Sequence, residues 1–318
     1  MPLQTELHRH LDVSARIGTL LSLTQERGLE PRSTSLEAFR EKITLSHPLR
    51  DLSTVLATFE LFQKVLDRPE ALERVAFEVV EDCHREGTRK VELRFSPSFV
   101  SEKNSLRWED VLAGFSSGVH RARKLYPDIE VGLLCIASRD YGTEEVDKTV
   151  EFFLRNRESF VGFDLAGNEV GFPCRLFEAS FKKLRQNGAR ITVHAGEAAG
   201  PENIWEAIEI LGAQRIGHGI SAVRDPRLMG FLREKRICLE MCPTSNWLTQ
   251  AVPSFEAHPL PLVLRQGISA CINTDDPGVF GVSLPNEVRV CREKMGMTEA
   301  EISLAFRHAE ASSFIFDR

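Results

Sequence analysis

Residues 191–197 read ITVHAGE, a short run rich in β-branched residues that leads into a histidine, a glycine and a glutamate. Such a run is typical of a strand buried in a parallel sheet. Metal-binding residue types also occur at the ends of the first and the last apolar segments of the chain, namely His8 with His10 and Asp275 with Asp276. Because the carboxyl ends of parallel strands meet at one end of a sheet, this recurrence predicts a functional site there.

Eight short apolar or β-rich segments occur along the 318 residues, and most are followed by a helical pattern. Strands that alternate with helices predict a parallel sheet, and eight such units predict closure into a (β/α)8 TIM barrel of the α/β class. We therefore expect residues 1–318 to form one barrel domain. The expected strands are residues 5–11, 90–95, 130–137, 161–165, 191–195, 215–217, 238–242 and 269–273.

The connection after the first expected strand is unusually long and runs from residue 12 to about residue 89. We expect it to form extra helices inserted into the barrel, including one over residues 52–66. The apolar face of that helix would be formed by Val55, Leu56, Phe59 and Phe62. Such a helix either packs outside the barrel or covers the site as a lid, and the pattern leaves the role of region 48–66 open.

Local capping signals predict where individual helices begin. A threonine followed three residues later by a glutamate is typical of a capping box. The pattern occurs at Thr298 with Glu301 and at Thr34 with Glu37.

The composition indicates which partners and compartments to expect. A net charge of -6 and a pI near 5.9 give no electrostatic basis for binding nucleic acid or acidic membranes. The apolar runs are too short to span a bilayer, and the first residues lack the pattern of a secretory leader. The seven cysteines form no C-x-x-C pair, which favours buried free thiols in a reducing cytoplasm. The oligomeric state is not predicted.

His8, His10, His194 and Asp275 are residue types that hold a mononuclear catalytic metal. Side chains two residues apart on a strand share a face, so both imidazoles of the H-x-H pair can reach one ion. An H-x-H pair alone is weak evidence, because surface pairs are common. His194 and Asp275 stand at the ends of other expected strands, which favours convergence of the four side chains on the barrel axis. Catalytic zinc in such a site keeps a position for water and lowers its pKa toward about 7.

Three further side chains are expected at the same end of the barrel. Glu197 stands three residues after His194, close enough to face a reaction without binding the metal. His218 lies between two glycines that leave room beside its ring. It is a candidate general base for the water, and Asp276 adds a second carboxylate beside Asp275.

Other motifs have simpler interpretations. Residues 84–86 (HRE) match half of the zinc cytidine-deaminase signature, but no P-C-x-x-C follows. Cys242 precedes a proline but has no second cysteine at metal-binding spacing, and His258 receives no role. The chain contains neither a G-x-S-x-G elbow nor a P-loop.

Six motifs, spread in order over nearly the whole chain, are shared with a known family. With them the chain resembles the adenosine deaminase family of zinc-dependent purine deaminases, which are amidohydrolase-like barrels. The resemblance implies hydrolysis of adenosine or 2'-deoxyadenosine to inosine or 2'-deoxyinosine plus ammonia, by attack of zinc-bound hydroxide at purine C6. The motifs are ELHRHLD at 6–12, DLAGNE at 164–169, HAGE at 194–197, RIGHG at 215–219, CPTSN at 242–246 and NTDDP at 273–277.

The resemblance also implies individual roles. Glu197 would protonate purine N1, and His218 would orient and deprotonate the water. Asp276 would contact both the hydroxide and purine N7. The Gly167 amide would bind N3, and Asp12 would receive the ribose 5'-hydroxyl.

The metal ligands follow from the same resemblance, with one zinc ion per chain and with His10 also bordering the substrate. The ligands would be His8, His10, His194 and Asp275.

One position departs from the family pattern, because Val13 follows Asp12 where a glycine is usual. A glycine there keeps the backbone close to the substrate, so Val13 predicts an altered pocket on the sugar side. Relatives with the same zinc site act on adenine, N6-substituted AMP or 6-amino-6-deoxyfutalosine, and another such 6-aminopurine is the alternative substrate. Asp12 favours a nucleoside, since a carboxylate accepts from a free hydroxyl and repels phosphate.

Two other functional classes predict different residues. A barrel that only binds would lack a metal ligand or Glu197, and all of these are present. A binuclear amidohydrolase usually has a lysine or glutamate at the end of the fourth strand. Residues 162–166 (GFDLA) contain neither, so the sequence favours a mononuclear hydrolase with a small-molecule purine substrate.

Overall fold

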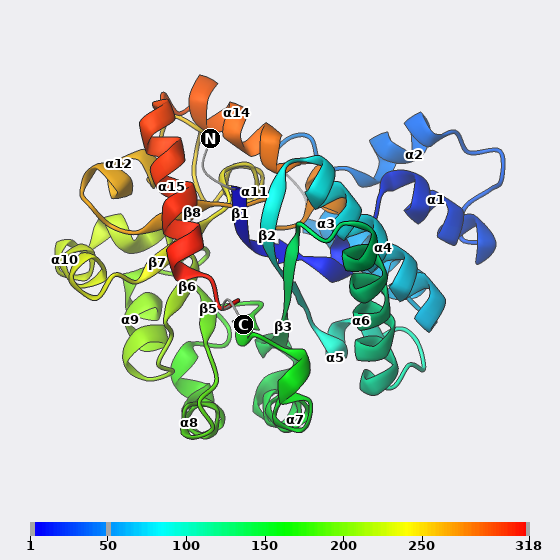
Figure 1. Ribbon diagram of the computed structural model, residues 1–318, viewed down its shortest axis with the longest axis horizontal. Coiled ribbons are helices and arrows are strands. Elements are labelled where there is room, and N and C mark those ends of the chain that lie inside the picture. Colours follow the sequence, from blue (N-terminus) through cyan, green and yellow to red (C-terminus); the bar gives the residue numbers. More distant parts are fainter. Residues whose placement is uncertain (1–3, 49–51, 316–318) are drawn as a thin grey trace.

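Parallel strands form a barrel in the computed structural model, which describes residues 4–48 and 52–315 with the side chains of residues 52–57 excepted (Figure 1). Each expected strand is present, with its ends displaced by at most two residues, so the predicted fold class is confirmed. The strands are β1 Gln4–His10, β2 Thr88–Phe95, β3 Glu130–Ser138, β4 Gly162–Ala166, β5 Thr192–Ala195, β6 Arg215–His218, β7 Cys238–Met241 and β8 Ala270–Ile272.

The strands pair as two four-stranded parallel sheets, β1–β4 and β5–β8, which meet at two seams. The seam between β8 and β1 has two backbone hydrogen bonds. The His10 N–H donates to the Asp275 carbonyl at 2.8 Å, and the Asp275 N–H donates to the His8 carbonyl at 3.0 Å. The first and last strands therefore meet at three of the four residues expected to hold a metal.

Helices surround the barrel and connect its strands, while α1 and α2 project from one side (Figure 1). The α-helices are α1 Ile17–Glu26, α2 Leu36–Ile43, α3 Leu52–Val65, α4 Pro69–Arg85, α5 Pro97–Ser101, α6 Trp108–Leu125, α7 Gly142–Arg155, α8 Glu178–Gln186, α9 Pro201–Glu209, α10 Pro226–Lys235, α11 Pro243–Leu248, α12 Leu260–Arg265, α13 Pro277–Phe280, α14 Leu284–Glu293 and α15 Glu299–Ser312. The 3-10 turns are η1 Leu11–Val13, η2 Arg139–Tyr141, η3 Arg157–Ser159, η4 Cys174–Phe177 and η5 Ile220–Arg224.

The strands are buried on both faces, as their continuous apolar runs predict. Every residue of β4 to β8 is buried, and all seven cysteines are buried free thiols. Among the residues described, no helix combines the length and the apolar character that a membrane crossing requires.

Helix α3 forms part of the wall of a hollow at the carboxyl ends of the strands. Phe59 and Gln63 line this hollow, and Phe62 is fully buried behind them. Of the two interpretations that the sequence leaves open, the position of α3 therefore favours the one in which it covers the site. Val55 and Leu56, which complete the expected apolar face, lie outside the described side chains.

The two capping boxes have different outcomes. At α15, the Thr298 hydroxyl accepts from the Glu301 N–H and the Glu301 carboxylate accepts from the Thr298 N–H, which confirms the first. The second prediction is wrong by one residue. Helix α2 begins at Leu36, and its N-cap is Ser35, whose hydroxyl accepts from the Ala38 N–H at 3.2 Å.

Buried charges run through the barrel interior beneath the carboxyl ends of the strands. Arg215 binds Glu92 and Glu240, each at 2.6 Å. Arg94 binds Glu240 and Asp164, each at 2.7 Å. The five side chains are at most 1% exposed, so each ion depends on its partners to offset the lost hydration.

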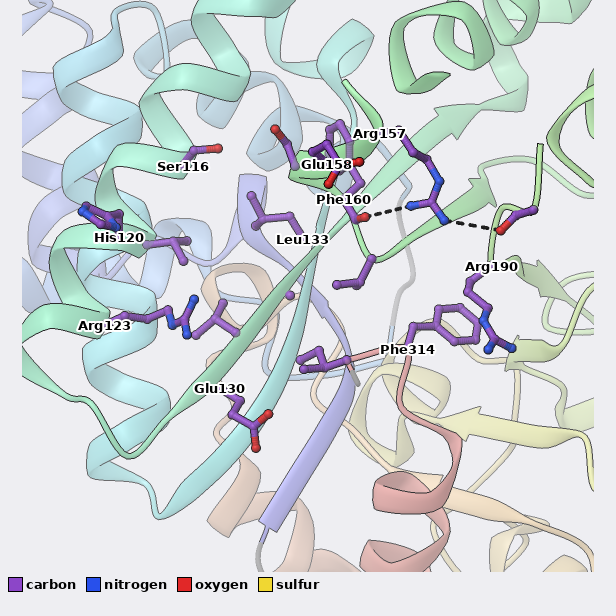
Figure 2. A pocket seen from close by; sticks show the side chains of 17 residues that line it. Ser116, His120, Arg123, Glu130, Leu133, Arg157, Glu158, Phe160, Arg190 and Phe314 are labelled. Atoms are coloured by element: carbon purple, nitrogen blue, oxygen red, sulfur yellow. Dashed lines mark hydrogen bonds between the residues drawn. The ribbon is translucent and has the colours of Figure 1, made fainter. Parts of the chain in front are cut away.

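A second hollow, of about 850 Å³, lies at the amino-terminal ends of β3 and β4 (Figure 2). Glu130, the first residue of β3, lines it together with Arg157. The Arg157 guanidinium donates to the Phe160 carbonyl at 3.0 Å and to the Gly188 carbonyl at 3.4 Å. These hydrogen bonds tie the guanidinium to the protein's own backbone. Sites of TIM barrels lie at the opposite end, and this hollow is not our candidate.

We predict that Arg215→Ala lowers the free energy of unfolding by about 3–5 kcal/mol, because it leaves the buried Glu92 without its cation and Glu240 with Arg94 alone. Urea unfolding followed by circular dichroism measures this change. Arg292→Ala is the matched control, since Arg292 pairs with Glu299 on the exposed surface and should have no measurable effect. Equal stabilities of the two variants would contradict the structural importance of the buried pairs.

Candidate active site

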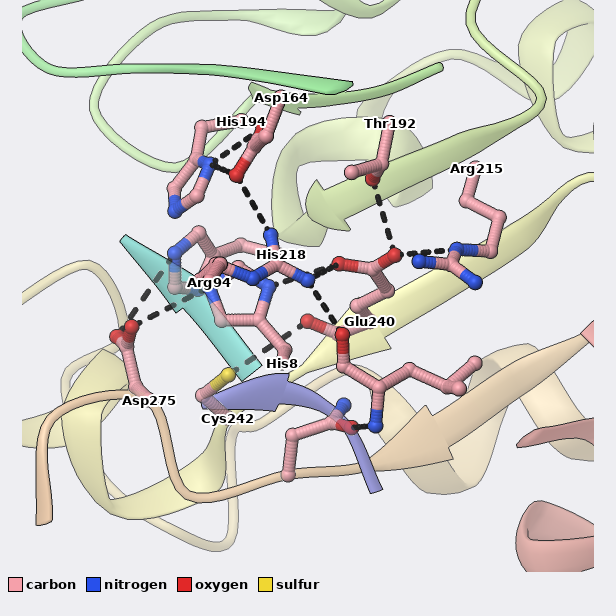
Figure 3. Close-up of polar contacts among 12 residues, drawn as sticks. His8, Arg94, Asp164, Thr192, His194, Arg215, His218, Glu240, Cys242 and Asp275 are labelled. Atoms are coloured by element: carbon pink, nitrogen blue, oxygen red, sulfur yellow. Dashed lines mark hydrogen bonds and ion pairs between the residues drawn. The ribbon is translucent and has the colours of Figure 1, made fainter. Parts of the chain in front are cut away.

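Four donor side chains converge at the carboxyl end of the barrel. His8 and His10 come from β1, His194 from β5, and Asp275 from the segment after β8. Their donor atoms all lie within 4.8 Å of one another. The His10 Nε2 is 3.3 Å from the His194 Nε2. The Asp275 Oδ1 is 3.2 Å from the His8 Nε2 (Figure 3). The structure thus brings together the residues that the sequence places at three different strand ends.

This donor set fits a divalent cation. Apart from the ion-pair contact with Asp275, the buried His8 Nε2 has no hydrogen-bond partner among the described residues, and the Nε2 atoms of His10 and His194 face each other. Burial lowers the pKa of His10 well below its usual value and that of His194 to about 4, so both rings are neutral, as metal ligation requires. Burial alone would raise the pKa of Asp275, but His218 and His8 outweigh it and hold this pKa well below its usual value.

Carboxylates hold two of the imidazoles from behind. The His8 Nδ1 lies 2.9 Å from Glu240, and the His194 Nδ1 lies 3.1 Å from Asp164 (Figure 3). An Nδ1–H that donates to a carboxylate leaves the Nε2 lone pair free for a metal. Burial lowers the pKa of His8, but the carboxylates of Asp275 and Glu240 outweigh it and raise this pKa, so a cation competes with a proton for its Nε2.

His218 and Asp275 share an unusual backbone conformation. Their φ angles are 59° and 67°, in the left-handed region that residues other than glycine seldom adopt. Strain of this kind persists where the surrounding structure holds it, often at functional sites. The two side chains meet, with the His218 Nε2 3.8 Å from the Asp275 Oδ2.

The expected catalytic carboxyl groups are beside this cluster. The Glu197 Oε2 is 3.5 Å from the His218 Nε2, and burial raises the pKa of Glu197 although His218 opposes the shift. Burial, reinforced by the charges of Asp275 and Asp12, also raises the pKa of Asp276 well above its usual value. The pKa values of the neighbouring Asp275 and Asp276 are therefore shifted in opposite directions.

A hollow of about 590 Å³ opens in front of these groups, within the roughly 300–1,000 Å³ of small-molecule sites. The Asp12 carboxylate accepts from the Ser96 N–H at 2.9 Å, and burial raises the pKa of Asp12 to about 7. Val13 is buried in the same wall, which places the departure from the family glycine at the pocket itself. Residues lining the hollow include His10, Asp12, Val13, Phe59, Gln63, Ile136, Gly167 and Glu197.

Gly167 tolerates no side chain in this wall. Its φ is 104°, and a Cβ atom would overlap the carboxylate of Asp140. The absence of a side chain therefore allows the backbone after β4 to border the hollow.

Glu169 holds the turn that carries Glu197. Its carboxylate accepts from three consecutive backbone N–H groups, those of Gly196 at 2.6 Å, Glu197 at 2.8 Å and Ala198 at 2.9 Å. Its side chain is buried, so the negative charge concentrates on these donors. The position of Glu197 in the site thus depends on a residue from the loop after β4.

The sequence alone did not assign a role to the residues that support the site. The available signal was a charged residue inside a buried strand, because such a residue needs a buried partner. Glu169 and Asn246 stand in two quoted motifs without a role of their own. The strand residues that carried the signal are Arg94 in β2, Asp164 in β4 and Glu240 in β7.

Comparison with known proteins gives a consistent result over the whole chain. A family model described as adenosine deaminase matches residues 3–318. An adenosine deaminase of Yersinia enterocolitica is 41% identical over 314 residues, covering 99% of this chain and 94% of the relative.

Two solved structures share the fold. Adenine deaminase from Arthrobacter aurescens superposes with a TM-score of 0.90 at 25% identity, covering 100% of this chain and 95% of that one. The N6-methyl-AMP deaminase of Arabidopsis thaliana gives 0.84 at 28% identity, covering 99% and 93%.

We predict that Glu169→Gln loosens the turn at residues 196–198 in an otherwise folded protein. An amide oxygen cannot replace two carboxylate oxygens for three donors, and the amide N–H groups would face backbone N–H groups. Hydrogen exchange of these amides should accelerate by about 10- to 100-fold, as expected for loss of charge-assisted hydrogen bonds. Mass spectrometry of the corresponding peptide measures this change.

Glu206→Gln is the matched control, because the Glu206 carboxylate on α9 accepts from the backbone N–H and the guanidinium of Arg175 in η4, and not from residues 196–198. Unchanged exchange at residues 196–198 in Glu169→Gln would show that other contacts hold the turn.

Proposed function

The chain belongs to the adenosine deaminase family, and from this premise we propose that it hydrolyses adenosine or 2'-deoxyadenosine to inosine or 2'-deoxyinosine and ammonia. It is a metal-dependent hydrolase that acts on a carbon–nitrogen bond of a small purine. The observation that carries the proposal is the meeting of four metal-donor side chains with the Glu197 carboxyl group beside one hollow.

We assign one zinc ion per chain to this donor set. Three imidazoles and a carboxylate are nitrogen and oxygen ligands that zinc accepts. When bound, zinc acts as a Lewis acid and lowers the pKa of a water toward about 7. The assigned ligands are His8, His10, His194 and Asp275.

We assign the proton donor for purine N1 to Glu197. Its raised pKa keeps it protonated at higher pH than an exposed glutamate. A proton on N1 draws electrons from C6, where the oxygen of water forms a bond. The C6–N bond then breaks, and the amino group leaves as ammonia with one proton of the water, while the other proton of the water returns to the Glu197 carboxylate. We assign His218 to contact the water.

The other contacts hold the purine in place. We assign Asp276 to purine N7. Its raised pKa keeps it protonated at higher pH than an exposed aspartate, and the protonated carboxyl group can donate a hydrogen bond to N7. We assign the Gly167 N–H to N3 and the carboxyl group of Asp12 to the ribose 5'-hydroxyl. These contacts orient C6 toward the donor cluster.

The charge of the hollow favours a nucleoside over a nucleotide. Among its described lining residues there is no lysine or arginine, whereas Asp12, Glu60, Glu102 and Asp140 contribute carboxyl groups. A phosphate placed there would meet negative charge without a cation to bind it. A 5'-monophosphate is therefore the less favoured alternative, while free adenine remains compatible with the same zinc chemistry.

We also propose a cytoplasmic location. Seven buried free thiols are suited to a reducing compartment.

A substrate panel tests the proposed function. Ammonia release by the zinc-loaded protein is measured with adenosine, 2'-deoxyadenosine, adenine, AMP and 6-amino-6-deoxyfutalosine, and methylamine release with N6-methyl-AMP. We expect the highest kcat/KM for the two nucleosides. Asp12→Ala should reduce kcat/KM for adenosine far more than for adenine. A preference for AMP would overturn the proposal that the carboxyl groups of the hollow exclude a phosphate.

We predict that Glu197→Gln retains its metal but loses about 10²- to 10⁴-fold in kcat, the usual contribution of a general acid. In the wild type, the protonated form is active, so activity should fall as pH rises through the raised pKa of Glu197. The amide does not titrate, so the residual activity of the variant should lack this alkaline decline. Steady-state kinetics across pH, with metal content from plasma emission spectrometry, measures both effects.

Asp275→Ala is the contrasting variant. Its activity should fall together with its zinc content, because it removes a ligand. Full zinc content in Asp275→Ala, or near-normal turnover in Glu197→Gln, would remove that residue from its assigned role.

A further inference from the structure

We propose that Asn246 is a positioning residue that sets the hydrogen-bond polarity of both His218 and Glu197, so that His218 presents an Nε2–H, and not a lone pair, to the reacting water. This inference rests on the proposed function for its catalytic meaning. Its structural content is the order of donors and acceptors in a buried hydrogen-bond chain that begins at the backbone of residue 260.

The chain begins at His258, to which the sequence assigned no role. Its ring is buried, and burial lowers its pKa to about 3, so the ring is neutral and holds a single proton. The Leu260 N–H donates to the His258 Nδ1 at 3.2 Å. The Nδ1 is therefore the acceptor, and the proton of the ring must lie on Nε2.

This proton determines which way the amide of Asn246 points. The His258 Nε2–H lies 3.2 Å from the Asn246 Oδ1, which can only accept. The backbone N–H of Cys242 donates to the same Oδ1 at 3.4 Å. Both donors would face amide hydrogens if the group were turned over. Asn246 is fully buried, so no water can relieve that repulsion cheaply.

The other end of the amide then has two hydrogens to donate. The Asn246 Nδ2 lies 3.0 Å from the His218 Nδ1 and 3.3 Å from the Glu197 Oε1. A hydrogen on the His218 Nδ1 would point at an amide hydrogen, so this nitrogen accepts and the proton of the neutral ring lies on Nε2. In the same way, the Glu197 Oε1 accepts, which leaves Oε2 free to carry the proton when the carboxyl group is protonated.

The two proton-bearing atoms thus face the same space. The His218 Nε2 and the Glu197 Oε2 are 3.5 Å apart, too far for a strong hydrogen bond between them. Each hydrogen is therefore available to other partners, such as the water for His218 and purine N1 for Glu197. An Nε2 that bears a hydrogen has no lone pair, so His218 orients the water by donating to its oxygen. This differs from the general-base role that its sequence position had indicated.

Nuclear magnetic resonance tests this arrangement without a substrate. Zinc-loaded protein is labelled with nitrogen-15 in its histidine rings, and His218 is assigned by the signals that His218→Gln removes. Long-range proton–nitrogen correlation then distinguishes a nitrogen that bears hydrogen from one that does not. We expect a bare Nδ1 and a protonated Nε2 in His218, and the reverse arrangement would overturn the proposal.

Asn246→Asp tests the role of the amide. Both carboxylate oxygens accept, so the variant should draw a proton onto the His218 Nδ1. We expect that change in the spectrum, together with unchanged zinc content, a kcat lower by about 10²-fold or more and a KM within a few-fold of wild type. An unchanged His218 spectrum in a folded Asn246→Asp protein would refute the positioning role.

The control and the wild-type spectrum keep the outcome decisive. Asn156→Asp makes the same chemical change at the end of α7, where the Asn156 side chain donates to the Phe152 carbonyl, and should alter neither the spectrum nor kcat. If Asn246→Asp fails to fold, the wild-type spectrum still decides the polarity of His218. Inactivity toward the whole substrate panel, with the expected spectrum, would reject the proposed function and leave the polarity established.

Discussion

The backbone hydrogen bonds between Asp275 and the end of β1 are the constraint on which the other features of the site depend. The same three residues that close the barrel, His8, His10 and Asp275, supply three of the four candidate metal donors. Their side-chain positions are therefore set by sheet register, which is far stiffer than a loop. Closure of the fold and assembly of the donor cluster are one structural event.

Beneath the donors, a few buried charged side chains each form ion pairs with more than one partner. Arg94 binds both carboxylates that support imidazoles, Glu240 behind His8 and Asp164 behind His194. A buried carboxylate next to a neutral imidazole alone would be poorly compensated. The arginine offsets that cost and leaves each carboxylate able to accept from an Nδ1–H. Directly beneath the donors, the barrel interior therefore contains a network of ion pairs in place of apolar side chains, and this network orients the imidazoles.

Much of the barrel and of the donor cluster could be predicted, because both rest on local patterns. Buried parallel strands are short apolar runs, and His194 stands directly at the end of one. The support of the donors could not be predicted in the same way. Only the register between distant strands brings Glu240 behind His8, and no local rule contains that register. The start of α2 was misplaced because Thr34 and Ser35 present the same capping chemistry, and packing chooses between them.

The two sheets divide the donors between them, with His8 and His10 in the first sheet and His194 and Asp275 in or after the second. A metal held by all four would cross-link the amino-terminal and carboxyl-terminal halves of the chain. A substitution that loosens either seam, however distant from the purine, would then act as a change in metal occupancy. The fraction of molecules that hold the metal would then report the fraction whose barrel is closed.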